Sequence, residues 1–146
     1  MLMQVGAVLV LLILGYIFGQ LAERRHYKSI IKRELEMNTL PAIASRFPPQ
    51  DRPYAQQLVT GNVVVSSDYF KSFIAGLVNL LGGSVVSYES LLDRARREAV
   101  LRMKKEAEAL GAELVFNIKY ETMPLGSSRL ASVEVLAYGT ALTPAR

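Results

Sequence analysis

Side chains that could perform acid–base chemistry occur as two adjacent pairs in the second half of the chain. Tyr88-Glu89 and Tyr120-Glu121 each place a phenol beside a carboxylate, and such groups can exchange protons with a substrate. Neither pair has a visible nucleophile–base partner. Each also fits an ordinary structural role, the first at a helix end and the second across the two faces of a strand. We therefore expect no catalytic activity.

Metal and nucleophile chemistry is limited by composition. The chain has 146 residues, no cysteine and a single histidine, His26. This excludes disulfides, thiolate or multi-histidine metal sites and a Ser/His/Asp triad in the globular part. Gly82-Gly83-Ser84 lacks the lysine and the fuller glycine spacing of a phosphate-binding loop. The carboxylates also form no calcium-loop signature: Asp68, Glu89, Asp93 and Glu121. No metal or cofactor is expected.

The stretch 87–121 contains the elements that would position the two pairs. Tyr88–Leu110 has apolar residues at helical spacing and predicts a helix of roughly 35 Å at about 1.5 Å per residue, ended by Gly111 in a left-handed conformation. The apolar face contains Tyr88, Leu91, Leu92, Ala95, Ala99, Met103 and Leu110, with Ala107 at its edge. The period then changes to two, which predicts a strand with one apolar face formed by Leu114, Phe116, Ile118 and Tyr120.

The N-terminal residues 1–22 carry no charged side chain and predict a transmembrane helix. We expect Val5, Leu9, Leu12, Gly15 and Gly19 within the span, and the last two form a GxxxG pair that could let two helices approach closely. A cleaved signal peptide is the main alternative. No basic residue precedes the apolar run and no clear cleavage site follows it, so a retained anchor is preferred.

Basic residues follow the span closely in residues 23–40, for which the spacing predicts a short amphipathic juxtamembrane helix. The positive-inside rule then places the C-terminal part in the cytoplasm, as a single-pass protein of the inner membrane. The net charge of +4 is modest and its excess lies beside the apolar run, which favours a lipid surface over nucleic acid. The basic residues either contact lipid or form a solvated collar, with His26 exposed among them: Arg24, Arg25, Lys28, Lys32 and Arg33.

Residues 41–53 contain four prolines and predict an irregular linker, so the globular domain is expected over 54–146. Val63–Val65 predict a first strand after a bend or bulge at Thr60-Gly61-Asn62. Residues 70–81 predict a short, very apolar helix, which needs a partner surface. Residues 132–143 predict a last strand that is covered on both faces and antiparallel to the previous one.

The segment GGSVVSYESLLDRARREAVLRMKKEAEALGAELVFNIKYET, followed by EVLAYGTAL, resembles the YbjQ-like family. The most specific matches are Tyr88-Glu89, Ala109-Leu110-Gly111-Ala112 and Tyr138-Gly139-Thr140-Ala141, and the resemblance covers about Gly61 to Leu142. It implies an α+β fold in which one long helix packs on a small antiparallel sheet, as in dodecin-like subunits. The N-terminal transmembrane helix is an addition to that domain.

The resemblance also implies ring assembly, as a homo-oligomer and specifically a pentamer. On this basis we expect an oligomer interface made of the apolar segment and the last strand: Phe70, Phe73, Ile74, Leu77, Val135 and Tyr138. Domains of this family are often labelled heavy-metal-binding. That label transfers poorly, because soft metals need thiolate or imidazole ligands and the domain has neither.

The leading functional hypothesis is a non-enzymatic, membrane-tethered oligomeric module on the cytoplasmic face that binds a partner protein or a small ligand. The alternative is a metal- or ligand-binding sensor. An enzyme is disfavoured by the missing nucleophile–base pair. A pore is disfavoured because the span offers only Gln4, Tyr16 and Gln20 as polar groups.

Overall fold

The computed structural model describes residues 2–49, 51–66, 86–125 and 132–145, and within these residues the chain forms two helices and three strands. The side chains of residues 2–5, 7–9, 12 and 86–88 also lie outside the description. The elements follow in the order α1 (Leu2–Glu36), β1 (Tyr54–Ser66), α3 (Val86–Ala109), β2 (Leu114–Leu125) and β3 (Ser132–Pro144). The apolar helix predicted over 70–81 falls outside the described residues.

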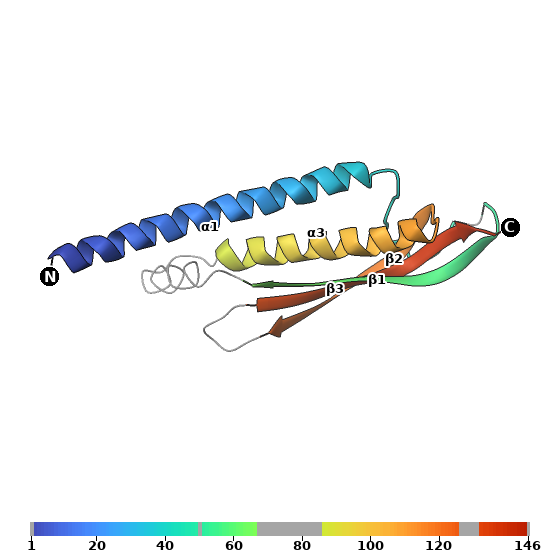
Figure 1. Ribbon diagram of the computed structural model, residues 1–146. Helices are drawn as coiled ribbons and strands as arrows, with labels where there is room; N and C mark the ends of the chain where they lie inside the picture. Colours follow the sequence, from blue (N-terminus) through green and yellow to red (C-terminus); the bar gives the residue numbers. More distant parts are fainter. Residues whose placement is uncertain (1, 50, 67–85, 126–131, 146) are drawn as a thin grey trace.

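The three strands form one antiparallel sheet in the order β1-β3-β2, so the last strand of the sequence is the central one. Helix α3 covers one face of this sheet, and α1 lies against α3 on the side away from the strands (Figure 1). The α+β fold and the antiparallel pairing of the last two strands are thereby confirmed. The core between α3 and the sheet contains mainly Val59, Val63, Leu91, Ala95, Ala99, Met103, Ala107, Val115, Val133, Val135, Ala137 and Ala141.

The apolar face predicted for α3 is largely confirmed, because Leu91, Ala95, Ala99 and Met103 are all buried. The helix ends at Ala109, so Leu110 lies past its end and stays 37% exposed. Gly111 adopts the left-handed conformation with φ 71°, and the Ala112 N–H donates to the Ala107 carbonyl at 3.0 Å. This is the glycine-ended helix that the sequence predicted.

Gly61 does not form the predicted bend or bulge, because β1 pairs with β3 without a register shift from end to end. A Cβ at Gly61 would lie 2.1 Å from the Ala99 carbonyl oxygen and 2.4 Å from the Met103 nitrogen of α3. The glycine therefore allows the helix backbone to lie directly on the strand.

The alternation predicted for β2 is wrong at its start, where Val115, expected on the face opposite Leu114 and Phe116, is fully buried in the core beside Ala141. The pairing with β3 shifts between Phe116 and Lys119, and Asn117 has a φ of 54°. This bulge inserts residues into the strand and changes the side to which the following side chains point. After the bulge, Ile118 packs against the core, and Tyr120, expected on the same face, pairs with the core residue Ala137 but is 46% exposed.

The proline-rich segment 41–53 is not a free tether along its whole length. Its first residues lie beside β2, where the Val115 N–H donates to the Pro41 carbonyl at 3.0 Å and the Ile43 N–H donates to the Val115 carbonyl at 2.9 Å. Leu40, just before the segment, is 7% exposed and belongs to the core. These contacts cover part of the outer edge of β2.

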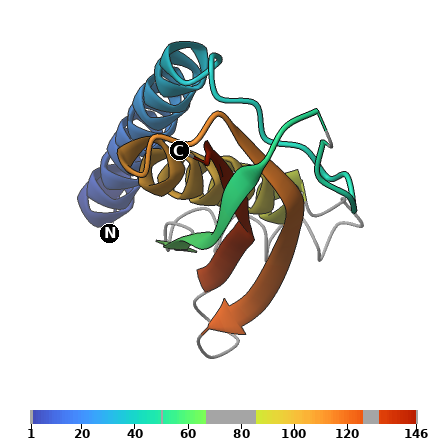
Figure 2. The same ribbon diagram turned by 90° about the vertical axis from the view of Figure 1, so that its right-hand side faces the viewer.

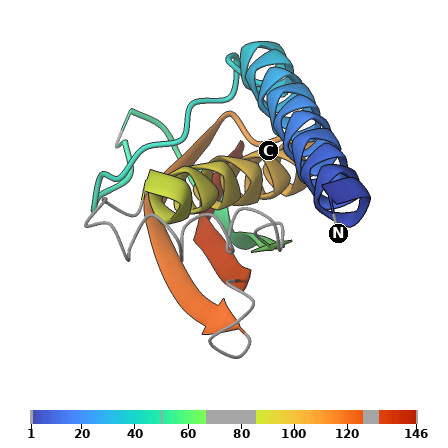
Figure 3. The same cartoon turned by 90° about the vertical axis from the view of Figure 1, so that its left-hand side faces the viewer.

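Helix α1 runs without interruption from Leu2 to Glu36, so it joins the region predicted as a membrane span, residues 1–22, to most of the juxtamembrane region predicted over residues 23–40. It is parallel to α3, since higher residue numbers of one helix face higher numbers of the other. Figures 2 and 3 show that α1 is displaced to the β1 side of α3. In Figure 1 its N-terminal half extends past the start of α3.

Candidate functional site

Two crossed ion pairs join the C-terminal half of α1 to α3. Arg33 donates two hydrogen bonds to the carboxylate of Glu98, at 3.0 and 2.5 Å. Arg97 donates two to the carboxylate of Glu34, at 2.8 and 2.5 Å. The dipeptide Arg33-Glu34 of α1 thus faces the dipeptide Arg97-Glu98 of α3. Both ion pairs have the bidentate geometry that is strongest between a guanidinium and a carboxylate.

Apolar contacts and side-chain hydrogen bonds to backbone carbonyls extend this seam in both directions. Ile30 of α1 is fully buried, and Leu101 of α3 is 3% exposed on the stripe that faces α1. The Tyr27 hydroxyl donates to the Ser90 carbonyl at 3.2 Å near one end, and Lys104 donates to the Met37 carbonyl at 3.3 Å near the other. The seam therefore follows most of the length of α3.

The charges of the seam perturb one another in the direction expected for ion pairs. The hydrogen bond from Arg33 holds the pKa of Glu98 below its usual value, and the hydrogen bond from Arg97 does the same to the pKa of Glu34. Both carboxylates are therefore ionised at neutral pH. Burial lowers the pKa of Lys104, and the nearby Glu34 partly opposes this.

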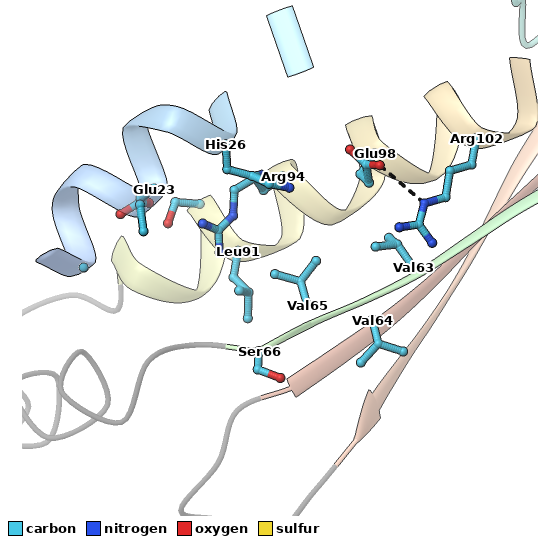
Figure 4. Close-up of a pocket in the computed structure, with 13 residues that line it drawn as sticks. Glu23, His26, Val63, Val64, Val65, Ser66, Leu91, Arg94, Glu98 and Arg102 are labelled. Atoms are coloured by element: carbon cyan, nitrogen blue, oxygen red, sulfur yellow. Dashed lines mark hydrogen bonds and ion pairs between the residues drawn. The ribbon is translucent and has the colours of Figure 1, made fainter. Parts of the chain in front are cut away.

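A cavity of about 390 Å³ opens where α1, α3 and the end of β1 meet. Its apolar lining includes Val63, Val65 and Leu91, and Gly19 and Ala22 of α1 lie along one side. Figure 4 shows Glu23, His26 and Arg94 in the region where α1 and α3 meet, and the valines of β1 on the opposite side of α3. The cavity's remaining lining residues are Glu23, Val64, Ser66 and Ser90 together with His26, Arg94, Glu98 and Arg102.

His26 is half-buried in this cavity, not exposed as predicted. Its Nδ1 atom is buried and has no hydrogen-bond partner among the described residues, and the same is true of the Arg94 Nε atom. Burial lowers the pKa of His26, and the cations of Arg94 and Arg33 lower it further, against an opposing effect of Glu98. The imidazole is therefore neutral at pH 7.

Arg102 connects the cavity to the edge of the sheet. Its guanidinium donates to Glu98 at 3.3 Å and to the Asn62 carbonyl at 2.8 Å, while the Thr60 N–H donates to Glu106 at 2.7 Å. Side chains of α3 thus satisfy backbone groups on the outer edge of β1. Such contacts hinder strand pairing with another chain at this point.

The residues predicted within a membrane span lie in the first half of α1. The side chains of Val5, Leu9 and Leu12 are outside the described residues, Gly15 is exposed, and Gly19 is half-buried beside the cavity. Among the described residues, no helix is apolar over a sufficient length to cross a membrane. The predicted transmembrane helix is therefore not confirmed.

Four of the five basic residues predicted at a membrane surface are exposed: Arg24, Arg25, Lys28 and Lys32. Arg33 is different, because it belongs to the seam with α3. The sequence could not place it there, since the pattern of residues 23–36 fits both a solvated collar and a helix that packs on another helix.

The predicted oligomer interface is only partly testable. Phe70, Phe73, Ile74 and Leu77 lie outside the described residues. Val135 is fully buried in the core of one chain, beneath α3, so the structure gives its side chain an intramolecular role, and the interface itself stays a prediction. Tyr138 points to the other face of β3 and is half-exposed.

Of the two acid–base pairs, Glu89, Tyr120 and Glu121 are exposed and do not line the cavity, and the side chain of Tyr88 lies outside the described residues. No group of three or more His, Asp or Glu side chains that could hold a metal ion occurs within residues 2–49, 51–66, 86–125 and 132–145. The sequence analysis missed Arg94, Glu98 and Arg102 as neighbours of His26. One signal was present, because Glu98 interrupts the apolar stripe seven residues after Leu91 and three after Ala95.

Comparison with known proteins finds a family match that covers most of the globular part. The YbjQ family, described as "Putative heavy-metal-binding", matches residues 49–144. A UPF0145 protein of Archaeoglobus fulgidus is 41% identical over 85 residues, which are 58% of this chain and 76% of that protein. A UPF0145 protein of Clostridium novyi is 39% identical over 85 residues, again 58% of this chain and 80% of that protein.

A solved structure of a protein of unknown function from the DUF74 family of Pediococcus pentosaceus is also similar, with a TM-score of 0.46 and 17% identity over 71% of this chain and 96% of that one. The family match includes β1, α3, β2 and β3, and it starts after α1. On the strength of this match and of the relatives from both domains of prokaryotes, the chain belongs to the YbjQ family.

Proposed function

We propose that this chain is a non-enzymatic, membrane-tethered module of the YbjQ family, held by α1 on the cytoplasmic face of the inner membrane, where it assembles as an oligomer and binds a small ligand or a partner. The observation that carries the tether is the exposed apolar surface on the first half of α1. Val10, Leu11, Ile13 and Phe18 are between 56 and 69% exposed, on different sides of one helix.

A helix that is apolar all round is stable only inside protein or lipid. Residues 1–22 have no charged side chain, and 22 residues of helix extend about 33 Å, close to the ~30 Å of a bilayer's hydrocarbon core. The described part of the chain does not cover this surface. A bilayer is the occupant that fits its length, its lack of charge and the basic residues that follow.

The basic residues support the orientation. Arg24, Arg25, Lys28 and Lys32 are exposed directly after the apolar run, whereas Arg33 is engaged by Glu98 of α3. The exposed residues could contact anionic lipid. Each such residue near an anionic surface contributes about 1 kcal/mol. The globular part would accordingly remain on the cytoplasmic side.

The tether is tested by washing bacterial membranes that contain the full chain with alkaline carbonate. We expect the wild type to stay in the pellet. The double substitution Leu11→Arg and Leu14→Arg should release it, because each arginine at a helix centre costs about 3 kcal/mol on insertion. Leu35→Arg is the matched control, since Leu35 is 71% exposed on the same helix but outside the apolar run. Release of the wild type by carbonate would contradict the tether.

Orientation is tested by adding protease to intact spheroplasts of cells that express a C-terminal tag. We expect the tag to be protected until the cells are lysed. Cleavage of the tag in intact spheroplasts would contradict the cytoplasmic placement.

Assembly is supported by the outer face of the sheet, which α3 does not cover. Leu58 is 63% exposed and Met123 60% exposed on this face, beside the half-exposed Leu136 and Tyr138. A two-layer domain of this size buries a thin core by itself, and association would cover these side chains. Light scattering of the detergent-solubilised full chain tests this, and a monomer at high concentration would contradict it.

A ligand-binding sensor is the second candidate, and the cavity between α1, α3 and β1 favours it. The described lining of the cavity supports an organic ligand over a heavy metal, because it has one imidazole, no thiolate, and a Glu98 already engaged by two arginines.

A further inference from the structure

Helix α1 has two opposite faces, and α3 covers only one of them. The covered face includes His26, Ile30 and Arg33, which are buried or half-buried. The opposite face carries a row of exposed side chains, here called the outer stripe: Leu14, Ile17, Leu21, Arg24, Lys28, Ile31 and Leu35. Figures 2 and 3 show this side of α1 facing away from the described elements of the chain. The outer stripe is therefore open to a partner.

The outer stripe repeats every 3.5 residues, because its members are alternately three and four positions apart. This is the spacing of the a and d positions of a coiled coil, which drifts across a straight helix but follows a partner helix that winds around it. Residues 23–36 make the pattern informative, since their apolar and aromatic side chains are few. Tyr27 and Ile30 lie on the α3 side, and Ile31 and Leu35 both continue the outer stripe.

A shallow hollow of about 260 Å³ lies on the outer stripe and is lined by Tyr16, Ile17, Gln20, Leu21 and Arg24. The last four of these residues are spaced i, i+3, i+4 and i+7. Four residues with this spacing form the hole that receives one side chain of a facing helix in knobs-into-holes packing. In a parallel pair in register, the side chain opposite this hole is Leu21 of the second helix. A second copy of α1 therefore supplies a side chain of suitable size at this point.

Lipid can cover only the first half of the outer stripe. If residues 1–22 span the bilayer, Ile31 and Leu35 lie about 13 and 20 Å beyond Ala22, at about 1.5 Å per residue. The headgroup region on one side of a bilayer is only about 5–8 Å thick. Arg24 and Lys28 come first after the span, where anionic headgroups reduce the repulsion between basic side chains of neighbouring copies. Ile31 and Leu35 need a protein partner to be covered.

We propose that the outer stripe of α1 is an interface between two copies of this chain, whose α1 helices pack parallel and in register. Leu21, Ile31 and Leu35 contact the same residues of the second copy. Anchors that enter one membrane in the same direction are already parallel, and tethering raises their local concentration. The inference deepens the assembly part of the proposed function and rests on the tether for this geometry.

The two basic layers of the outer stripe set the strength of the pair. A charged residue at an a or d position fixes the register of a coiled coil at a cost in stability. Arg24 and Lys28 occupy two successive positions of this kind. We therefore expect the α1 helices to pair in the membrane and to separate in detergent, where the exposed face of the sheet remains as the contact between copies.

Disulfide crosslinking tests the interface, because the chain has no cysteine of its own. Full-length Ile31→Cys and Leu35→Cys place one thiol on the outer stripe. Ser29→Cys and Glu36→Cys are the matched controls, since both residues are exposed on the same stretch of α1 but lie off the stripe. Copper phenanthroline is added to an unfractionated lysate without detergent. Two cysteines join only when their Cα atoms are within about 7 Å, so we expect at least about fivefold more disulfide-linked dimer from the stripe than from the controls.

A second pair of variants tests packing separately from proximity. Ile31→Lys in the Leu35→Cys chain adds a third basic layer to the outer stripe and should reduce the dimer several-fold. Ser29→Lys in the same chain adds the same charge off the stripe and should leave the dimer unchanged. Ile31 and Ser29 are both exposed, so neither substitution disturbs the contact with α3.

Equal crosslinking of the stripe and control cysteines would overturn the proposal, and so would a disulfide product whose mass is not twice that of the chain. The lysate contains the chain whether or not it is anchored, so the crosslinking result does not depend on the carbonate wash. A wild type that stays in the pellet while Ile31→Cys and Leu35→Cys fail to crosslink would keep the tether and remove the pairing of α1. Dissociation by Leu58→Glu tests the sheet face independently of both.

Discussion

The docking of α1 on α3 can be tested most directly through Glu98. Its side chain is 8% exposed, and it accepts two hydrogen bonds from Arg33, whose side chain is 33% exposed, and one from Arg102. Exposed ion pairs contribute about 0.2–1 kcal/mol, and breaking a fully buried pair costs about 3–5 kcal/mol. Because the burial of this pair is intermediate, Glu98→Gln should lower the free energy of unfolding by about 2 kcal/mol. For a domain of this size that lowers the melting temperature by about 8 °C.

The assay is thermal unfolding of the detergent-solubilised full chain, followed by circular dichroism, for Arg33→Gln, Glu98→Gln and the double variant. Hydrogen exchange at residues 23–36 adds a local readout, because a short polar helix that leaves its partner frays and exchanges faster. Glu36→Gln is the matched control, since Glu36 pairs with Lys32 within α1 at 3.7 Å and both side chains are well exposed. It should change stability by less than about 0.5 kcal/mol.

The pH dependence gives a second check on the same pair. Arg33 lowers the pKa of Glu98 in the folded state below the ordinary value of 4.5. The unfolded state therefore binds a proton first as the pH falls, so the stabilisation is present above about pH 4.5 and is lost as the pH falls through the lowered pKa. Glu98→Gln should remove this part of the acid sensitivity. Equal costs for Glu98→Gln and Glu36→Gln, with no faster exchange in α1, would refute the docking role of the pair.

Three further predictions follow from single residues. Gly61→Ala should cost about 3 kcal/mol in unfolding free energy, because its Cβ would lie 2.1 Å from a carbonyl oxygen of α3. Gly111→Ala should cost only about 1 kcal/mol, because Gly111 has a φ of 71° but open space around it. Equal melting temperatures for the two variants would contradict this. His26→Gln should remove the loss of stability that begins as the pH falls below about 6.5, because burial lowers the pKa of His26 in the folded state and the unfolded chain takes up the proton first. An unchanged pH profile of the melting temperature would contradict this. Leu58→Glu, on the exposed face of the sheet, should dissociate the proposed oligomer in light scattering, and Arg96→Glu, on α3, should not.

The parts of the fold that could be predicted are those set by local pattern. The helical spacing of Leu91, Ala95 and Met103 and the glycine after the helix describe α3 without any knowledge of its neighbours. The resemblance to the YbjQ-like family added the antiparallel sheet, and the family match confirmed the assignment. Local periodicity works here because α3 packs one continuous face on the sheet.

The parts that could not be predicted depend on contacts between distant residues. A bulge at Asn117 changes which residues of β2 face the core, and no property of the neighbouring sequence signals it. Gly61 looked like a turn residue, although its role is to let a helix approach. Arg33 and Glu98 are 65 positions apart, and both have ordinary local patterns. The cavity lies beside this contact between α1 and α3, so the sequence did not predict the cavity either.

The absence of a joint in α1 has a mechanical consequence. The chain contains no proline or bend between Leu2 and Glu36, and it first changes direction at residues 37–40, near the far end of α3. A rotation or tilt of the N-terminal end of α1 is therefore transmitted along the helix to its contacts with α3. It reaches His26 and Arg94 before it reaches the turn at residues 37–40. The wall of the cavity is therefore the first part of the contact between α1 and α3 that such a movement strains.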